Sequence, residues 1–459
     1  MNVNPNQSPK ALPESLLAPS ITELVKRNMN RAIRLTNELM QVHVTLVNSD
    51  EIHRYEIRTA EADYMWNNWY TELSNIRDIY TSGEETANKT YMGISLILDA
   101  WVMSLLTDTF GDVPYKDAIK GRAGLYMPAF DKQEDIYADL FQKLDSANVL
   151  LAEGGNLAVA QAEQDPLYQG NALLWRKFGN SLYLRLLLRV SGKPDAIAGG
   201  KTAAEKIREI VDERPGDYPI MTSIEESATL KFTGVVPYQS EFHNWRAYDF
   251  NGDNSLSQFF VNNLVQWGDP RLELWATTWE GIYSGVPSGY AVTNLPEGQS
   301  RYKPELARES RLGNILNYPE LQFILAEAAL KEYTSGDAQM HYEKGVVSAI
   351  TLWDVEVPEG HLEKDEVKWG SDYSFDSKME LIHLQKYYTL FFTDFQQWFE
   401  HRRTGHPVLP KGPGLRNDGM MPARINYPLY VQSLNQASYQ AAVAEQGPDN
   451  INTKVWWQE

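Results

Sequence analysis

Apolar residues recur at helical spacing along most of this chain. In the segment 90–108 they stand three or four residues apart, at Ile94, Leu98, Trp101 and Leu105, which places them on one face of a helix. Strict alternation of apolar and polar residues, the pattern of a half-buried strand, is rare. The same helical period predicts further helices over residues 133–151, 174–190, 319–333, 339–353 and 381–400. The pattern therefore predicts a mainly α-helical protein.

Two of these helices match a tetratricopeptide unit, a pair of antiparallel helices that stacks into a helical repeat. Six consensus positions of such a unit carry Leu325, Ala326, Ala329, Ala338, Tyr342 and Gly345. The small residues allow the two helices to approach closely, and the aromatic residue fills the space between them. The usual proline near the end of the unit is replaced by Ile350. The match indicates a tetratricopeptide-like helical-repeat scaffold.

Changes in amino-acid composition along the chain predict its organisation. Residues 1–20 contain four prolines, which predicts an extended lead-in rather than a packed element. The remainder, 21–459, is expected to form a single body. Its scaffold lies mainly in 21–213 and 319–410, and a C-terminal irregular segment occupies 411–459.

Between the two scaffold parts, residues 214–318 are rich in Gly, Pro, Asn and aromatic residues. Only 255–267 keeps a helical stripe there, with Asp253 or Asn254 as its cap. We therefore expect a loop-rich, irregular lobe inserted in the helical body. Binding residues concentrate on such loops when a rigid scaffold holds them, so this excursion is the predicted ligand surface.

Composition and charge exclude several classes of partner. The formal net charge of −19 argues against nucleic acid, because phosphate binding needs a surplus of Lys and Arg, and against anionic lipid. The chain has no cysteine, so disulfides and thiolate chemistry are both excluded. Its best apolar run, 93–106, is interrupted by Asp99 and falls short of the about 20 residues of a membrane span. We expect no part of the polypeptide to span a membrane.

Sequence motifs of catalysis, metal binding and cofactor binding are missing. Asp249, Asn251 and Asp253 have the spacing of a calcium loop, but Asn254 and Phe260 stand where that loop needs Gly and Glu. A polar turn is the better interpretation. No zinc motif, nucleophile elbow or phosphate loop occurs, and nothing singles out a pair of carboxylates for glycoside hydrolysis. The sequence therefore predicts no metal, no cofactor and no enzyme.

Aromatic residues are the compositional oddity, with 13 Trp, 25 Tyr and 15 Phe. Most are expected in the helical core, Trp267 among them, and the remainder are candidates for exposed platforms that stack on sugar rings. The excursion supplies the aromatic candidates Trp279, Tyr283, Tyr290, Trp245, Tyr248 and Trp275. Polar side chains interleaved with them, which could bind hydroxyl groups at a platform edge, are Asn244, Arg246 and Asp249.

Several long motifs, in order along the chain, resemble the SusD/RagB family of nutrient-binding lipoproteins of Bacteroidetes. They include LLTDTFGDVPYKDA at 105–118, WRKFGNSLYLRLLLRVS at 175–191, LQFILAEAAL at 321–330 and QKYYTLFFTDFQQWFEHRRTGHP at 385–407. The subgroup that ends in a Trp-Trp pair is the most similar, since a Gly-x-Asp at 447–449 precedes Trp456 and Trp457.

That resemblance implies a tetratricopeptide-like scaffold, with an irregular lobe that forms the ligand surface. It also implies a cell-surface protein, anchored in the outer membrane by an acylated cysteine, that delivers a glycan to a TonB-dependent transporter of the SusC type. The first residues lack a signal peptide, and the anchoring cysteine is absent. We therefore expect Met1 to mark a start from which the export signal and anchor have been removed.

Three rival functions stay open from the sequence alone. A peptide-binding member of the same family would need charged pairs for the peptide termini. An α-helical glycoside hydrolase would need two carboxylates facing each other in a cleft. An assembly scaffold would bury the aromatic residues of the excursion and bind no small ligand. The aromatic excess favours the glycan.

Overall fold

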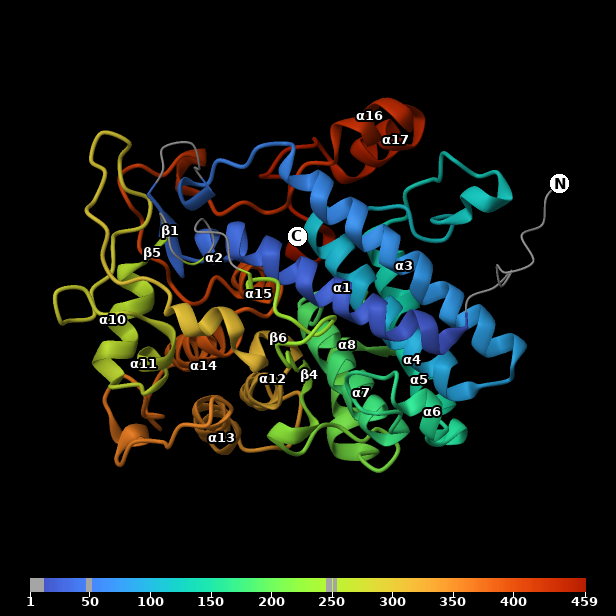
Figure 1. Cartoon of the computed structure of the whole chain (residues 1–459), viewed down its shortest axis with the longest axis horizontal. Coiled ribbons are helices and arrows are strands. Elements are labelled where there is room, and N and C mark those ends of the chain that lie inside the picture. The colour runs from blue at the N-terminus through green and yellow to red at the C-terminus, as the bar shows by residue number, and fades with distance from the viewer. Residues whose placement is uncertain (1–11, 47–51, 245–249, 251–253) are drawn as a thin grey trace.

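The chain folds into a body of packed helices with short strands between them (Figure 1). The computed structural model describes residues 12–46, 52–244, 250 and 254–459. The longer helices are α1 (Pro13–Arg34), α3 (Glu61–Glu85), α4 (Lys89–Phe110), α5 (Gln133–Gly154), α7 (Ala172–Arg189), α10 (Gln258–Trp267), α12 (Tyr318–Leu330), α13 (Ala338–Thr351), α14 (Phe375–Thr389), α15 (Gln396–Thr404) and α17 (Gln436–Gln446). The shorter ones are α2 (Thr36–Leu39), α6 (Val159–Ala162), α8 (Ala203–Arg208), α11 (Arg271–Trp275) and α16 (Leu429–Leu434). The predicted mainly α fold is confirmed.

Strands are few and short in the described part of the chain. They form three two-stranded antiparallel sheets, in which β1 (His43–Thr45) pairs with β5 (Asn254–Leu256), β2 (Ile197–Ala198) with β3 (Lys201–Thr202), and β4 (Ala228–Leu230) with β6 (Gly313–Leu316). Two of these sheets join segments distant in sequence. The β1–β5 sheet ties the excursion to the N-terminal region, and the β4–β6 sheet joins the two ends of the excursion to each other.

The helices pack mainly against their neighbours in sequence, as expected of a helical repeat. In the first half α1 packs on α3, α3 on α4, α4 on α5 and α5 on α7, and in the second half α12 packs on α13 and α14. The α4 helix is long and apolar enough to cross a membrane, but nearly all of it is buried inside the protein. Its Asp99 is paired with Arg77 at 2.8 Å and with Lys143. It is a core helix.

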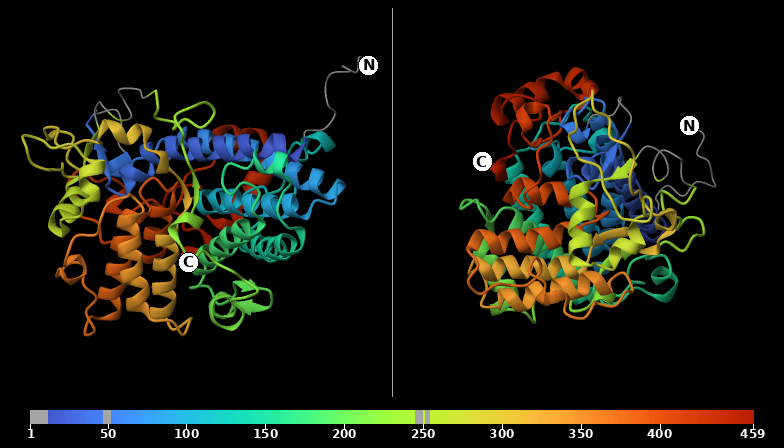
Figure 2. Two further views of the ribbon diagram at one scale, coloured as in Figure 1. Left: turned by 60° about the horizontal axis from the view of Figure 1, so that its bottom comes forward. Right: turned by 90° about the vertical axis from the view of Figure 1, so that its left-hand side faces the viewer.

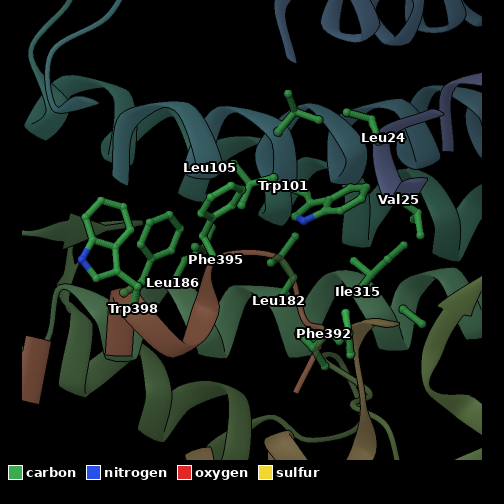
Figure 3. Packing of buried hydrophobic residues seen from close by; sticks show 14 of the residues in the cluster. Leu24, Val25, Trp101, Leu105, Leu182, Leu186, Ile315, Phe392, Phe395 and Trp398 are labelled. Atoms are coloured by element: carbon green, nitrogen blue, oxygen red, sulfur yellow. The ribbon is translucent and has the colours of Figure 1, made fainter. Parts of the chain in front are cut away.

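One continuous core joins the two helical groups (Figure 3). Trp101 and Leu105 of α4 face Leu182 and Leu186 of α7 across this core, and Phe395 lies between them. Each of these side chains is fully or almost fully removed from solvent. Burial of side chains of this size stabilises the fold by about 1.5–3 kcal/mol each, so the interface between α4 and α7 is a main source of stability.

The predicted tetratricopeptide pair is present as α12 and α13. Tyr342 is fully buried between the helices, and its hydroxyl donates a hydrogen bond of 2.6 Å to the carbonyl oxygen of Val367. A Cβ added to Gly345 would lie 2.7 Å from a ring carbon of Phe323. The close approach therefore requires the glycine, as the sequence pattern predicted.

Buried charges connect the ends of several helices. Arg189 of α7 contacts Asp108 of α4 at 2.6 Å and Glu400 of α15 at 3.1 Å. Arg403 binds both carboxylate oxygens of Glu327, at 2.7 and 2.6 Å, and contacts Glu400 at 2.8 Å. Burial by itself would raise the pKa of Glu327, but Arg403 holds that pKa well below its ordinary value. Arg403 therefore connects α15 to α12, and Gly405 at φ 77° ends α15.

The predicted single helix over 381–400 is wrong, because the chain breaks between α14 and α15. Phe392 and Asp394 have positive φ angles of 60° and 35°, which a continuous helix does not allow. The apolar stripe runs on across the break since Phe391 and Phe395 still fill the core. Hydrophobic spacing alone could not reveal the turn.

Three further boundaries differ from the prediction. The lead-in is shorter than expected, since α1 begins at Pro13, and proline at the first position of a helix is favourable. The helix α10 is capped by Ser257 rather than Asp253 or Asn254, because 254–256 forms β5. The segment 411–459 is only partly irregular, since it contains α16 and α17.

Candidate functional site

An aromatic cleft lies at one end of the molecule, where three segments distant in sequence meet. They are the first turns of α3, the loop 114–128 and the helix α16, which lie together at the top of Figure 1. The cleft has a volume of about 500 Å³, within the range of small-molecule sites. Its lining consists of Trp66, Asn67, Tyr70, Thr71, Pro114, Ala118, Ile119, Gly121, Leu125, Tyr126, Pro128, Tyr430, Val431, Leu434 and Asn435. We call it the α3–α16 cleft.

Aromatic side chains form the walls of the α3–α16 cleft. Trp66 is only 7% exposed and backs the wall, held edge-on against Phe110 with ring centroids 5.1 Å apart. The Tyr70 ring lies 5.1 Å from Trp66, and its hydroxyl donates a 2.7 Å hydrogen bond to the carbonyl oxygen of Pro114. Tyr126 projects from the loop with 79% of its surface exposed. A fixed wall and an exposed ring together can hold a flat, partly apolar ligand between them.

Polar groups in the cleft are few and uncharged. The Asn67 side-chain oxygen accepts a 2.7 Å hydrogen bond from the Tyr430 hydroxyl, which ties α3 to α16. The Asn435 side-chain nitrogen donates a 2.7 Å hydrogen bond to the carbonyl oxygen of Pro128, which ties α16 to the loop. None of the described residues that line the cleft is Asp, Glu, Lys, Arg or His. The site therefore favours an uncharged ligand.

The loop that forms one wall is anchored by the Gly-Asp-x-Pro-Tyr turn. Gly111 has φ 83°, a conformation that glycine adopts without steric cost. A side-chain oxygen of Asp112 accepts a 2.8 Å hydrogen bond from the backbone N–H of Gln133 at the start of α5. Burial raises the pKa of Asp112 to about 6. These contacts fix the base of the cleft wall, so the turn has an architectural role.

Ile119 is the strained residue of the same wall. Its φ of 67° is left-handed, an outlier for a β-branched residue. Such a conformation costs roughly 1–3 kcal/mol and is concentrated at ligand sites. Its position in the cleft lining adds to the case that this wall is shaped for binding.

A second, larger hollow of about 860 Å³ runs beside β4. Its lining includes the charged residues Glu163, Glu225 and Lys231, and Tyr238 is its single aromatic residue. It lacks the aromatic walls that the α3–α16 cleft offers. We therefore take the smaller cleft as the candidate site.

The prediction that Trp275 and Tyr290 are exposed on the ligand surface is wrong. Trp275 is fully buried, with its ring centroid 4.7 Å from that of Phe391. Tyr290 is 3% exposed and stacks on His53 at 4.9 Å. Trp275 belongs to the main core, where its ring contacts Phe260 and Trp353, and Tyr290 packs with Val44 and Val286. Trp267 is buried, as predicted.

Trp279 and Tyr283 are half-buried and lie on one tight hairpin. The backbone N–H of Trp279 donates to the carbonyl oxygen of Ile282 at 2.7 Å, and that of Ile282 donates back at 3.0 Å. Glu280 and Gly281 between them have φ 49° and 85°, the sign pattern of a type I′ turn. This rigid turn presents Ile282 with 64% of its surface exposed. The hairpin stays a candidate ligand surface.

The other predicted site residues are only partly described. Asn244 is exposed, whereas Trp245, Arg246, Tyr248 and Asp249 lie outside the described residues, as do Asn251 and Asp253 of the polar turn.

The sequence prediction missed the α3–α16 cleft. Its aromatic residues come from three segments that no local pattern connects. One signal was available, since the loop sequence KGRAGLYMP places Leu125 and Tyr126 in a Gly- and Pro-rich stretch that cannot bury them.

One buried cluster has the separations of a metal site. Glu327, His383 and Glu400 bring ligand atoms within 4.8 Å of one another. The carboxylate oxygens are already bound by Arg403, and Glu400 also contacts Lys386 at 2.7 Å. The arginine and lysine charges take the place that a metal ion would fill, so this is an ion-pair cluster.

Comparison with known proteins finds relatives over nearly the whole chain. The model of the SusD-like family, described as starch-binding and associating with the outer membrane, matches residues 5–428. Three solved structures share the fold. They are a SusD homologue from Bacteroides fragilis (TM-score 0.83, 23% identity, 98% of this chain and 100% of that chain covered), one from Bacteroides uniformis (0.81, 23%, 97% and 99%), and a chitin-binding SusD homologue from Flavobacterium johnsoniae (0.83, 21%, 97% and 98%). No curated protein matches the chain.

Proposed function

Because this chain belongs to the SusD-like family, whose description is starch-binding and associating with the outer membrane, we propose that it captures a neutral oligo- or polysaccharide at the cell surface. The aromatic, uncharged α3–α16 cleft carries this proposal. Sugar rings present apolar C–H faces and many hydroxyl groups, and they stack on aromatic side chains. The half-buried Tyr70 and the exposed Tyr126 offer such surfaces within a volume of about 500 Å³, and the buried Trp66 supports Tyr70 from behind.

The same cleft disfavours a peptide ligand with free termini. A terminal amine or carboxylate brings a full charge, and burial of an unpaired charge is costly. The lining offers no charged side chain to pair with it. A peptide-binding role, the alternative within the family, would need another surface.

Capture without hydrolysis is part of the proposal. Glycoside hydrolysis uses two carboxyl groups on opposite sides of the scissile bond, about 5–9.5 Å apart. No Asp or Glu belongs to the lining of the α3–α16 cleft. A sugar held there would therefore leave unchanged.

We propose further that the captured glycan passes to a TonB-dependent transporter of the SusC type, with this protein facing outward on the outer membrane through a lipid anchor. The helices α12 and α13 lie at the end opposite α16 in Figure 1 and in the right-hand view of Figure 2. The tetratricopeptide-like scaffold is thus free to contact a transporter while the cleft holds a ligand. Co-purification with such a transporter from outer membranes tests this step.

The function is tested by affinity electrophoresis through gels that contain neutral polysaccharides, followed by calorimetry with the retained glycan. Tyr126→Ala should weaken binding about 5- to 150-fold, since stacking on one aromatic ring is worth roughly 1–3 kcal/mol. Because Tyr126 is 79% exposed, the melting temperature should stay nearly unchanged. Trp279→Ala is the matched variant on the hairpin.

The two variants separate the two candidate surfaces. Loss of binding in Tyr126→Ala alone supports the α3–α16 cleft, whereas loss in Trp279→Ala alone would move the site to the hairpin. Retention of no glycan by the unaltered protein would refute glycan capture. Release of shorter sugars from a retained polysaccharide would show that the protein is a hydrolase.

A further inference from the structure

We propose that the α3–α16 cleft selects sugars that carry acetamido groups, such as N-acetylhexosamines. The inference rests on the proposed function and deepens it. An acetamido group has one N–H donor, one carbonyl acceptor and one methyl group. The cleft offers a counterpart for each of the three.

The donor that would meet the acetamido carbonyl is the side-chain nitrogen of Asn67. Asn67 is exposed on α3, and its side-chain oxygen is already engaged by the Tyr430 hydroxyl at 2.7 Å. In the structure the amide oxygen lies toward Tyr430, and no described residue accepts a hydrogen bond from the amide nitrogen. Both N–H groups remain available to a ligand, since an amide nitrogen carries two donors.

The acceptor that would meet the acetamido N–H is the side-chain oxygen of Asn435. Its amide nitrogen donates to the carbonyl oxygen of Pro128 at 2.7 Å, so the orientation of this amide is fixed. No described residue donates a hydrogen bond to its oxygen. Asn435 is 8% exposed, and its side-chain oxygen can accept a hydrogen bond from a ligand, since an amide oxygen has two lone pairs.

The methyl group would meet the apolar part of the lining. Ala118 and Val431 are buried at 4% and 8% exposure, and the half-buried Ile119 lies beside Ala118 in the chain. A hydroxyl group placed against these side chains would lose its water without gaining a hydrogen bond. An acetyl methyl group gains from the same burial. The lining thus distinguishes an acetamido group from a hydroxyl group at the same ring position.

A peptide bond also combines an N–H with a carbonyl group, so a neutral peptide is the competing ligand of this chemistry. The aromatic walls favour the sugar, because a pyranose ring offers a flat apolar face to Tyr70 and Tyr126 whereas an extended backbone does not. A capped, uncharged peptide therefore belongs in the test.

The decisive experiment compares two matched probes by calorimetry. Chitotetraose and cellotetraose share the same β-1,4-linked backbone and differ only in an acetamido or a hydroxyl group at carbon 2. We expect chitotetraose to bind about tenfold more tightly or better, as expected for two neutral hydrogen bonds. A capped tetra-alanine peptide is the third probe.

Asn67→Asp tests the assigned donor with almost no change of shape. It keeps an oxygen for the Tyr430 hydroxyl but replaces the donor by a second acceptor, so the preference for chitotetraose should fall about threefold or more, as expected for the loss of one of the two hydrogen bonds. Asn68→Asp is the control, because it adds the same charge one residue away. Its side-chain nitrogen donates to the carbonyl oxygen of Tyr64 at 2.7 Å, and Asn68 is not part of the cleft lining.

Three results would overturn the inference. Equal binding of the two tetrasaccharides, with both weakened by Tyr126→Ala, would refute acetamido selection while leaving glycan capture intact. An unchanged preference in Asn67→Asp would refute the assigned donor. Tighter binding of the capped peptide than of either sugar would refute both the selection and the proposed function.

Discussion

Glu38 provides a direct test of how burial controls stability in this fold. It lies in α2, is 2% exposed, and accepts a 2.7 Å hydrogen bond from the Thr45 hydroxyl and one of 3.3 Å from the backbone N–H of His53. Burial raises the pKa of Glu38 from its ordinary value of 4.5 to about 7, because the two hydrogen bonds only partly replace lost water. At neutral pH the folded protein therefore holds this proton more tightly than the unfolded chain.

The sign and size of the effect follow from linkage. A carboxyl group with a raised pKa stabilises the fold fully below pH 4.5, and this contribution is lost as the pH rises to about 7 and beyond. Each pKa unit corresponds to about 1.4 kcal/mol. Between pH 5 and pH 8 the free energy of unfolding should therefore fall by about 2–3 kcal/mol through Glu38 alone.

Glu38→Gln removes the titration while keeping the shape of the side chain. Urea unfolding at several pH values between 5 and 8 gives the free energy of unfolding of the wild type and of the variant. The variant should gain about 2–3 kcal/mol relative to the wild type across this range. The exposed Glu84→Gln serves as the control and should show no such gain. Parallel pH profiles for the wild type and Glu38→Gln would show that burial does not raise this pKa.

The remaining predictions concern the buried contacts of the helix ends and the binding cleft. Arg403→Met should lower the free energy of unfolding by about 3–5 kcal/mol, because Glu327 and Glu400 lose a buried partner; urea unfolding measures this, and a loss below 1 kcal/mol would contradict it. Trp457→Ala should lower the free energy of unfolding by about 3–5 kcal/mol, since the Trp457 side chain is 5% exposed. Trp456→Ala should lower it by less, because Trp456 is half-buried. Thermal melts compare the two variants, and equal losses of stability would contradict the burial argument. In calorimetry Tyr126→Ala should weaken glycan binding, and Asn67→Asp should reduce the preference for acetamido sugars.

Much of the helical scaffold could be predicted from the sequence because helix periodicity is a local property. The stripes at 133–151 and 174–190 coincide with α5 and α7 to within three residues at each end. The close packing of α12 against α13 could be predicted as well, because the missing side chain of Gly345 leaves space for the ring of Phe323. Between α14 and α15 the chain turns while its apolar spacing continues, so hydrophobic periodicity did not predict the break between these helices.

The candidate site was predicted less well, and the physical reason is burial. Trp275 and Tyr290 stand in the same Gly-rich excursion as Trp279 and Tyr283, yet the first pair is buried and the second is half-exposed. Composition gives the number of aromatic residues that a segment must accommodate. It does not say which of them other elements will cover, because the covering residues, such as Phe391, come from elsewhere in the chain.

The sequence by itself determined the helical class, the repeat pair, the family resemblance and the absence of charge complementarity to nucleic acid, since each follows from local spacing, composition or motif order. Only the tertiary structure brought α3, the loop 114–128 and α16 together around one cleft. Trp66, Tyr126 and Tyr430 lie far apart in sequence and meet because helix packing and the anchored turn at Gly111 set their positions. Contacts between distant segments decide which side chains face solvent, and binding depends on that choice.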